Sequence, residues 1–245
     1  MSTQPSHFDR LKDKSWRMAN LYKIVDKFSN LITFKRNAAQ EHFNQNRHGR
    51  DIILKSRRIG FTTDAALNQT DDTLFNKNFN ALFISYDDPS SKKVFDEIVM
   101  MAWQHFPLQK AFQVDMSNAN QLKLDFGDKT YSSIEVKSTG RGGRYNSLHI
   151  SEFAKICAKY PNKAVEILSG TIPSLTPNGT LTIESTAEGE QGLYHDMFWD
   201  AWNRTLQATP TNPLGPNELK AHFYNWQWDL QEIAQIKQLD SQIPK

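Results

Sequence analysis

Short apolar runs alternate with helix-like stretches along most of the chain, beginning near residue 51. The runs have the length of buried strands and fall at residues 51–55, 81–86, 121–126, 133–137, 147–151 and 181–185. Helical patterns lie between several of them, at residues 62–75, 90–106, 162–168 and 193–206. Such alternation predicts an α/β fold with a mostly parallel central sheet that helices cover on both faces.

Three features modify this simple alternation. A Gly127-Asp128 turn between two of the runs predicts an inserted hairpin. The residues before the first strand look helical, while a Pro/Gly-rich connector near the end precedes an aromatic strand and a final helix. We therefore divide the chain into a helical N-terminal segment (1–50), a core (51–207) and a C-terminal part (208–245).

Composition and charge narrow the possible functions only a little. The net charge of the 245 residues is +2, so a nucleic-acid-binding surface would have to be local. Cys157 is the single cysteine, which excludes an internal disulfide and a CxxC metal site. The polar N-terminus is unlike a signal peptide, and no apolar run approaches the roughly 20 residues that span a bilayer. We expect no membrane partner.

The segment DIILKSRRIGFTTDAA (51–66) has the order of a phosphate-binding loop, with an apolar strand, a short loop and the start of a helix. Gly60 and Thr62 fill the last glycine and the hydroxyl position of the fingerprint G-x-x-x-x-G-K-[ST]. Phe61 stands where the lysine belongs, and Lys55 stands where the first glycine belongs. A lysine at the loop entrance can reach the same phosphate oxygens. By itself, the loop is equally compatible with an ordinary strand-to-helix turn that has a solvated basic face.

A carboxylate follows a second apolar strand, in SLHISEFAK (147–155). In P-loop enzymes such a strand delivers an acidic residue for Mg²⁺ and then a Glu that orients and deprotonates water. Glu152 matches that Glu, whereas Ser151 replaces the acidic metal-side residue with a hydroxyl able to hold metal-bound water. Taken alone, a helix-capping Ser-Glu pair is the alternative.

Two further loops carry candidate functional residues. Ser185 and Thr186 follow the last apolar run, where small hydroxyls are suited to sensing a γ-phosphate, although an ordinary β-to-α turn looks the same. Arg141 and Arg144 lie in the Gly-rich loop STGRGGRYNS and are candidates for contacts with phosphate or DNA. As an alternative, these arginines simply lie on an exposed loop.

Together, in this order and spacing, these pieces resemble the N-terminal ATPase domain of tailed-phage terminase large subunits, the P-loop (ASCE-type) motor of DNA packaging. KSRRIGFTT resembles the deviant Walker A of that family, in which the lysine moves to the start of the loop. LHISEFA resembles its Walker B, and ESTAEGEQGLYHDMFWDAW its coupling motif with the helix that follows. NAAQEHF, with Gln40, is similar to the glutamine motif that reads adenine. The resemblance covers residues 37–228.

The resemblance implies a set of site residues. The nucleotide-binding set is Gln40, Lys55, Ser56, Arg57, Arg58, Ile59, Gly60, Phe61, Thr62 and Thr63. Thr62 would bind Mg²⁺ directly and Ser151 through water, while Glu152 would activate the attacking water. Arg57 or Arg58 would stabilise transition-state charge in cis, and Ser185 and Thr186 would couple hydrolysis to DNA movement. Arg141 or Arg144 would be the alternative, an arginine finger supplied in trans or a DNA contact.

The function implied is hydrolysis of ATP with Mg²⁺ to drive double-stranded DNA into a procapsid. The implied partners are DNA, the portal protein, the small terminase subunit and further copies in a ring, with a monomer in isolation. The implied location is the cytoplasm of the bacterial host, and transiently the portal vertex of the procapsid. The sequence ends at Lys245 with no acidic nuclease cluster, so we expect no cutting by this chain. A helicase-like translocating ATPase and a degenerate P-loop scaffold without turnover are the alternatives.

Overall fold

The structure is a computed structural model that describes residues 7–140 and 142–228. One sheet contains the strands β10 (Lys220–Tyr224), β3 (Arg50–Lys55), β9 (Leu175–Ser185), β8 (Tyr145–Ser151), β4 (Asn80–Ile84), β7 (Tyr131–Lys137), β6 (Gln121–Asp125) and β5 (Gln113–Ser117), in that spatial order. Neighbours from β10 to β7 run parallel, whereas β6 and β5 add antiparallel strands at one edge. The predicted mostly parallel sheet is confirmed.

Helices and short turns connect these strands. The α-helices are α1 (His7–Arg10), α2 (Lys14–Asn20), α3 (Ala38–Asn46), α4 (Phe61–Phe75), α5 (Asp88–Val94), α6 (Met101–Gln104), α7 (Phe153–Lys159), α8 (Pro161–Glu166) and α9 (Leu193–Gln207). Helical turns of other pitch are η1 (Phe95–Met100), η2 (Gln109–Ala111), η3 (Ile167–Thr171), η4 (Ile172–Ser174) and η5 (Trp226–Trp228). None of the helices in the described part of the chain is long and apolar enough to cross a membrane.

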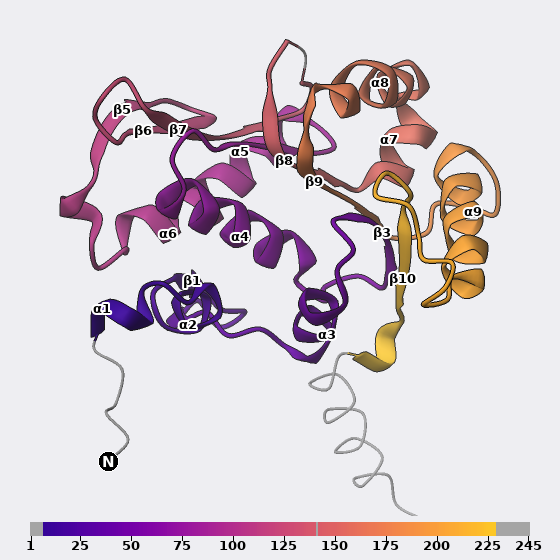
Figure 1. The fold of residues 1–245 in the computed structure, drawn as a ribbon, viewed down its shortest axis with the longest axis horizontal. Helices are drawn as coiled ribbons and strands as arrows, with labels where there is room; N and C mark the ends of the chain where they lie inside the picture. Colours follow the sequence, from indigo (N-terminus) through magenta and orange to yellow (C-terminus); the bar gives the residue numbers. More distant parts are fainter. Residues whose placement is uncertain (1–6, 141, 229–245) are drawn as a thin grey trace, which may run out of the picture.

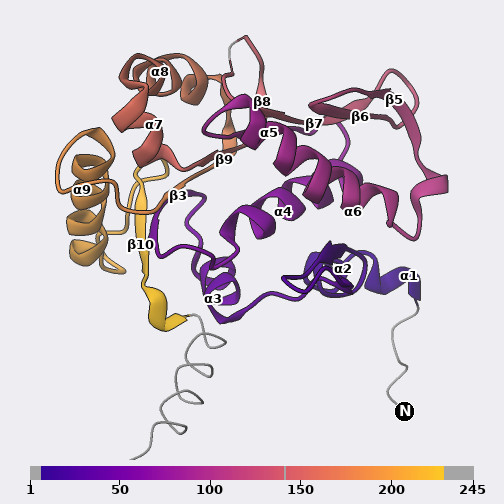
Figure 2. The ribbon, with the colours of Figure 1, turned by 180° about the vertical axis from the view of Figure 1, so that it is seen from behind.

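The sheet is covered on both faces, as a parallel sheet requires. Figures 1 and 2 show α4 on one face, with α7, α8 and α9 on the other. Strand β4 illustrates the division, because Ala81 and Phe83 pack with the α4 side while Leu82 and Ile84 pack with α7, α8 and α9. The two resulting cores hold the carboxyl ends of β3, β8 and β9 side by side at one edge.

The hairpin predicted around Gly127 is confirmed as β6 and β7. The helix expected at 90–106 is interrupted by the π-helical turn η1, and α7 is a helix that the sequence pattern does not indicate. The N-terminal segment contains helices and also a small antiparallel pair, β1 (Lys23–Val25) with β2 (Leu31–Thr33). The final helix that we expect after the aromatic strand lies outside the described residues.

A buried ion pair fastens the N-terminal segment to α4. Arg17 of α2 donates from Nε and Nη2 to the two carboxylate oxygens of Asp71, at 2.9 and 2.7 Å. The Tyr22 hydroxyl donates to the same carboxylate at 2.6 Å. The guanidinium of Arg17 also lies 4.0 Å from the centre of the Phe75 ring. These contacts place α2 and α4 in fixed register.

Candidate nucleotide-binding site

The loop between β3 and α4 is held in a defined shape by two residues with left-handed backbone. Gly60 has φ of 79° and Arg58 has φ of 64°. From the side, α3 supports the loop, since Asn37 donates to the Ile59 carbonyl at 2.9 Å and Gln40 donates to the Gly60 carbonyl at 2.8 Å. The N–H groups of the first turn of α4 have no partners within the helix, so this end of the helix is suited to an anion.

Phe61 is anchored in a small aromatic core rather than exposed to solvent. Its side chain is buried, with ring centres 5.6 Å from Phe43 of α3 and 5.0 Å from Tyr224 of β10. An apolar residue therefore begins α4 because this position joins the loop to α3 and β10. The position cannot also deliver a cation.

Lys55, at the end of β3, delivers that cation from the other end of the loop. Its Nζ lies 3.1 Å from Oε2 of Glu184 and 3.4 Å from Oε1 of Glu152. Burial alone would lower the pKa of Lys55, but the two carboxylates outweigh burial and raise the pKa above its usual value. The lysine is thus fully charged and is held between two acidic groups at the mouth of the loop.

Glu184 is a site residue that the sequence analysis misses. It lies on β9, directly opposite Ser151 of β8, and none of its surface is exposed. Its Oε1 accepts hydrogen bonds from Ser151 at 2.6 Å and from Thr62 at 3.3 Å. Burial would raise the pKa of Glu184, yet the charge of Lys55, with His149 and Ser151, lowers it to about 2. The available signal was a charged residue within an otherwise apolar strand.

Glu152 begins α7 in a strained backbone conformation. Its φ of 57° and ψ of 42° are left-handed, which is uncommon for a residue with a side chain and is often found at functional sites. The carboxylate remains about one third exposed, between Lys55 and the hydroxyl of Thr186, which donates to its Oε2 at 3.4 Å. Its position is that of a group able to accept a proton from a bound water molecule.

Ser185 and Thr186, the residues expected to couple hydrolysis to movement, both contact the Glu152 region. The buried Ser185 hydroxyl accepts a hydrogen bond from the Ala154 N–H at 3.1 Å, which ties the end of β9 to the first turn of α7. Thr186 reaches Glu152 itself. The two side chains therefore link the strand that follows the site to the helix that carries Glu152.

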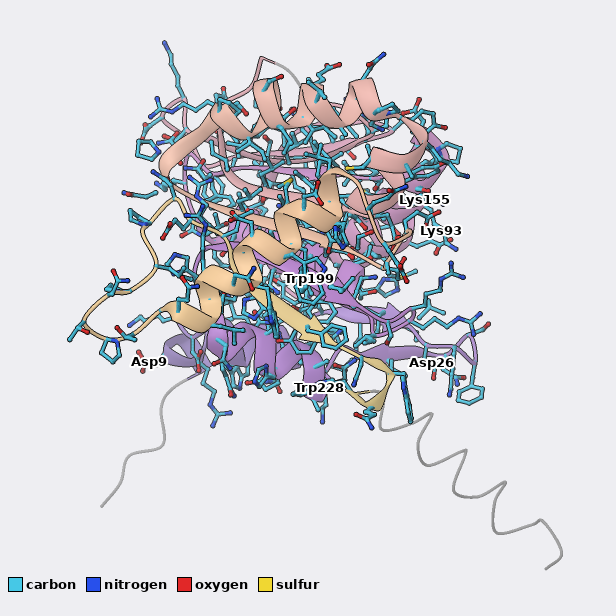
Figure 3. The ribbon with its side chains drawn as sticks, turned by 90° about the vertical axis from the view of Figure 1, so that its right-hand side faces the viewer. Asp9, Asp26, Lys93, Lys155, Trp199 and Trp228 are labelled. Atoms are coloured by element: carbon cyan, nitrogen blue, oxygen red, sulfur yellow. The ribbon has the colours of Figure 1, made fainter. Side chains whose placement is uncertain are left out.

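These elements enclose a cleft of ≈ 530 Å³, which is within the usual range for small-molecule sites. The residues that line it are Lys55, Arg57, Arg58, Gly60, Phe61, Thr62, Glu152, Lys155, Lys159, Thr186 and Glu188. Lys155 and Lys159 of α7 are additional cations that the sequence analysis misses. They lie four residues apart and therefore on one face of the helix that follows Glu152. Lys155 is labelled in Figure 3, and its Nζ lies 3.8 Å from the centre of the Tyr86 ring.

Other predicted residues lie outside this cleft. Gln40 is buried under the loop, where its Oε1 accepts from the Asn37 N–H at 2.9 Å while its Nε2 donates to Gly60. Thr63 faces a separate pocket beside β1. Arg144 is exposed at the amino end of β8, whereas Arg141 lies outside the described residues.

The arrangement fits a magnesium–nucleotide complex better than a metal bound by protein alone. No cluster of three or more His, Cys, Asp or Glu side chains suited to a metal occurs within residues 7–140 and 142–228. Mg²⁺ in phosphate-transferring enzymes usually takes one or two carboxylates, with phosphate and water supplying the other ligands. Here the buried Oε2 of Glu184 pairs with the Lys55 ammonium at 3.1 Å, and the hydroxyls of Ser151 and Thr62 lie next to the other carboxylate oxygen. These donors are of the chemical type that Mg²⁺ prefers.

A loop that enters a helix at the carboxyl edge of a parallel sheet, with a lysine and a carboxylate facing across it, defines the class of P-loop NTPase folds. In this chain, β9 lies between the loop strand β3 and the strand β8 that leads to Glu152.

More particularly, the fold is that of the ATPase domain of phage large terminases. The large terminase ATPase domain of Thermus phage P74-26 is similar over 86% of this chain and 90% of that chain, at 14% identity and a TM-score of 0.59. The HK97 bacteriophage large terminase is similar over 89% of this chain, at 16% identity and a TM-score of 0.61. A large terminase of a thermophilic bacteriophage in complex with ATP-gamma-S is similar over 86%, at 14% identity and a TM-score of 0.54.

The chain spans less than half of the HK97 protein (44%) and half of the terminase bound to ATP-gamma-S (50%). No protein-family model matches the chain, and no curated protein sequence is significantly similar to it. At identities of 14–16% the structural likeness establishes the fold.

Proposed function

We propose that this chain is an ATP-hydrolysing motor domain that acts on double-stranded DNA. One observation carries the proposal: Lys55 and Glu152 face each other at 3.4 Å in a cleft large enough for a nucleotide. A charged lysine at the mouth of the loop is suited to the β- and γ-phosphates. A carboxylate across from it is suited to orienting and deprotonating the water that attacks the γ-phosphate.

Each part of the cleft has a role in this reaction. Lys55 and the N–H groups of the loop would hold the phosphates, and the Thr62 hydroxyl would lie on their metal side. Bound Mg²⁺ would neutralise part of the phosphate charge. Glu152 would take a proton from the attacking water. Arg57 and Arg58, both exposed in the loop and lining the cleft, are the arginines available to the γ-phosphate within the same chain.

The link from the cleft to movement runs through the end of β9. A change of partner at the Glu152 carboxylate would also change its hydrogen bond from Thr186, and Ser185 is bonded to the first turn of the helix that Glu152 begins. The helix α9 follows this segment after Gly192. We propose that this connection transmits the state of the nucleotide to the residues that contact DNA.

The resemblance to terminases supplies the biological setting of the proposal. The DNA would be a viral genome entering a procapsid, and the partners would be the portal protein, the small terminase subunit and further copies of this chain in a ring. The setting would be the cytoplasm of a bacterial host. A helicase-like motor would separate the strands of a duplex, whereas a packaging motor would move the duplex intact, so a strand-separation assay distinguishes the two.

Steady-state ATPase measurement with Glu152→Gln tests the proposal. We expect the variant to bind ATP with unchanged affinity and to lose about 10²–10⁴ in rate, since only the proton transfer is removed. Asp128→Asn, a carboxylate-to-amide change at the exposed turn between β6 and β7, should hydrolyse ATP normally. Normal turnover by Glu152→Gln would remove Glu152 from the mechanism. If the wild-type chain binds ATP without turnover, the chain is a nucleotide-binding scaffold instead.

A further inference from the structure

A buried carboxylate lies beside the position at which this site lacks one. The sequence has Ser151 where P-loop enzymes usually have an acidic residue for Mg²⁺. The strand register sets Glu184 of β9 directly opposite Ser151 of β8. The two side chains are joined by a hydrogen bond of 2.6 Å from the Ser151 hydroxyl to Glu184 Oε1.

Burial of the Glu184 carboxylate is expected to lower the stability of the fold, which suggests that its charge has a function. The side chain is wholly buried, with the Lys55 ammonium 3.1 Å from Oε2 and His149 Nε2 3.6 Å from Oε1. A buried carboxylate usually destabilises a protein relative to an apolar residue of similar size, even when it is paired. Lys55 by itself does not require Glu184 as a partner, because Glu152 already lies 3.4 Å from the same amine.

The hydrogen bonds to Glu184 orient two hydroxyls in a useful way. Thr62 and Ser151 both donate their protons to Oε1, at 3.3 and 2.6 Å. A hydroxyl that donates its proton in this way leaves its lone pairs free for a cation or for cation-bound water. Such outer contacts set the orientation and strength of groups that bind a metal. Thr62 is the loop hydroxyl that the proposed function places on the metal side of the phosphates.

We propose that Glu184 supplies, from the neighbouring strand, the negative charge for nucleotide-bound Mg²⁺ that Ser151 cannot supply. The carboxylate then comes from β9 instead of β8, and it holds the hydroxyls of Ser151 and Thr62 on the metal side of the cleft. The inference rests on the proposed function, since it assigns a residue to the magnesium of the same ATP complex.

The test is the effect of Mg²⁺ on nucleotide affinity, which does not depend on turnover. Isothermal titration with ATP-gamma-S in Mg²⁺ and in EDTA gives, for each variant, the factor by which Mg²⁺ tightens binding. For Glu184→Gln, which preserves shape and removes charge, we expect this factor to fall by about 10–100-fold, the usual cost of losing an outer-shell metal partner. Asp128→Asn, which removes one carboxylate charge at the exposed turn between β6 and β7, should keep the wild-type factor.

A charge-relocation variant makes the test specific. Ser151→Asp combined with Glu184→Gln returns the carboxylate to β8, and we expect it to restore the effect of Mg²⁺ to within a few-fold of wild type. Thermal unfolding of each variant checks that it is folded. If Glu184→Gln alone does not fold, the double variant tests the proposal. A wild-type effect of Mg²⁺ on its nucleotide affinity supports the proposal, and loss of that effect overturns it.

Two outcomes would overturn the inference while leaving the proposed function intact. One is an unchanged Mg²⁺ factor in a folded Glu184→Gln. The other is tighter binding in EDTA with an unchanged factor, which would show that Glu184 only holds Lys55 away from phosphate. If the wild-type chain does not bind ATP-gamma-S in either condition, the proposed function fails instead.

Discussion

At the scale of single residues, Phe61 occupies the lysine position of the loop fingerprint, and Lys55 is the nearest lysine to the mouth of the loop. Phe61 packs between Phe43 and Tyr224 and fixes the start of α4. Lys55 brings its charge to the mouth of the loop from the end of β3. Lys55 therefore provides, from a different position, a positive charge near the loop that Phe61 does not provide. Loss of the Phe61 ring would leave a cavity, so a control at this position has to preserve apolar volume.

Lys55→Ala should weaken binding of ATP-gamma-S by at least about 10-fold. The expected loss follows from removal of a charge-assisted contact worth roughly 1.5–3 kcal/mol. Phe61→Leu should bind nearly as the wild type does, since it keeps the core filled and carries no charge. Calorimetric titration of both variants checks this prediction. Equal losses in the two, or no loss in Lys55→Ala, would refute the relocated lysine.

At the scale of elements, α3 acts as a support for the loop. Its capping box uses Gln40, whose amide oxygen accepts from the Asn37 N–H and whose amide nitrogen holds the Gly60 carbonyl. Gly60 is confined by the same contact, because a Cβ atom there would lie 2.8 Å from the Gln40 amide nitrogen. The residue expected to read adenine therefore has a clear second role in shaping the loop.

Gln40→Ala separates these two roles of the glutamine. Since the side chain is only 4% exposed, we expect the loop to lose its support and binding to weaken by a similar factor, about 3–10-fold, for ATP and GTP. Competition titrations with the two nucleotides measure that factor. A loss confined to ATP would show instead that Gln40 reads the base, as the resemblance implies.

The second element-scale feature is the attachment of α2 to α4 through Arg17 and Asp71. Asp71→Asn removes one charge of a buried pair and leaves the Arg17 guanidinium without compensation. We expect it to lower the free energy of unfolding by about 3–5 kcal/mol. Asp96→Asn is the matched control, because its exposed pair with Lys92 is worth less than about 1 kcal/mol.

Urea unfolding followed by tryptophan fluorescence compares the two variants. Equal effects of Asp71→Asn and Asp96→Asn would show that the buried pair does not hold the N-terminal segment in place. An early unfolding phase confined to Asp71→Asn would show that this segment separates before the sheet unfolds.

At the scale of the whole molecule, Arg57 and Arg58 lie at the opposite edge of the sheet from Arg144. Arg57 and Arg58 line the cleft at the carboxyl edge. Arg144 lies just before β8, a strand of seven residues, and Glu152 lies just after it. At about 3.3 Å per residue, the strand separates them by roughly 25 Å. Arg144 is therefore too far from this cleft to act within its own chain, and only a neighbour's cleft or DNA is open to it.

We expect the arginine that assists hydrolysis to act in cis. The specific ATPase activity should then be independent of protein concentration, and Arg57→Ala or Arg58→Ala should abolish most of it. Arg144→Ala and Arg141→Ala should leave the rate of isolated chains unchanged, although both are expected to weaken a salt-sensitive contact with duplex DNA. Steady-state rates over a range of concentrations, with and without duplex DNA, provide the measurement.

An activity that rises with concentration and is lost in Arg141→Ala or Arg144→Ala would contradict the cis assignment. It would point to an arginine supplied by a neighbouring copy, a contribution worth roughly 10³–10⁵ in related NTPases.

The sequence alone determined those features that depend on neighbouring positions. The short apolar runs predict strands that are buried on both faces. Their alternation with helical segments predicts that these strands form a parallel sheet. Gly127 indicated the hairpin, and the order of the Lys55 loop and the Glu152 strand indicated a nucleotide site, since carboxyl ends of parallel strands share one edge. A sequence motif was easiest to interpret where all of its residues lie within one loop.

Only the tertiary structure decided what depends on residues far apart in the chain. The opposition of Glu184 and Ser151 follows from the register of β9 on β8, which a single sequence does not reveal. The burial of Phe61 depends on β10, whose sequence begins more than 150 positions later. The N-terminal hairpin packs on α6 and η1, and α7 packs on β9, so tertiary contacts stabilise both more than local preference does. Which charges meet in the cleft is therefore set by how the strands align, and the side chains that complete the site come from β3, β8 and β9.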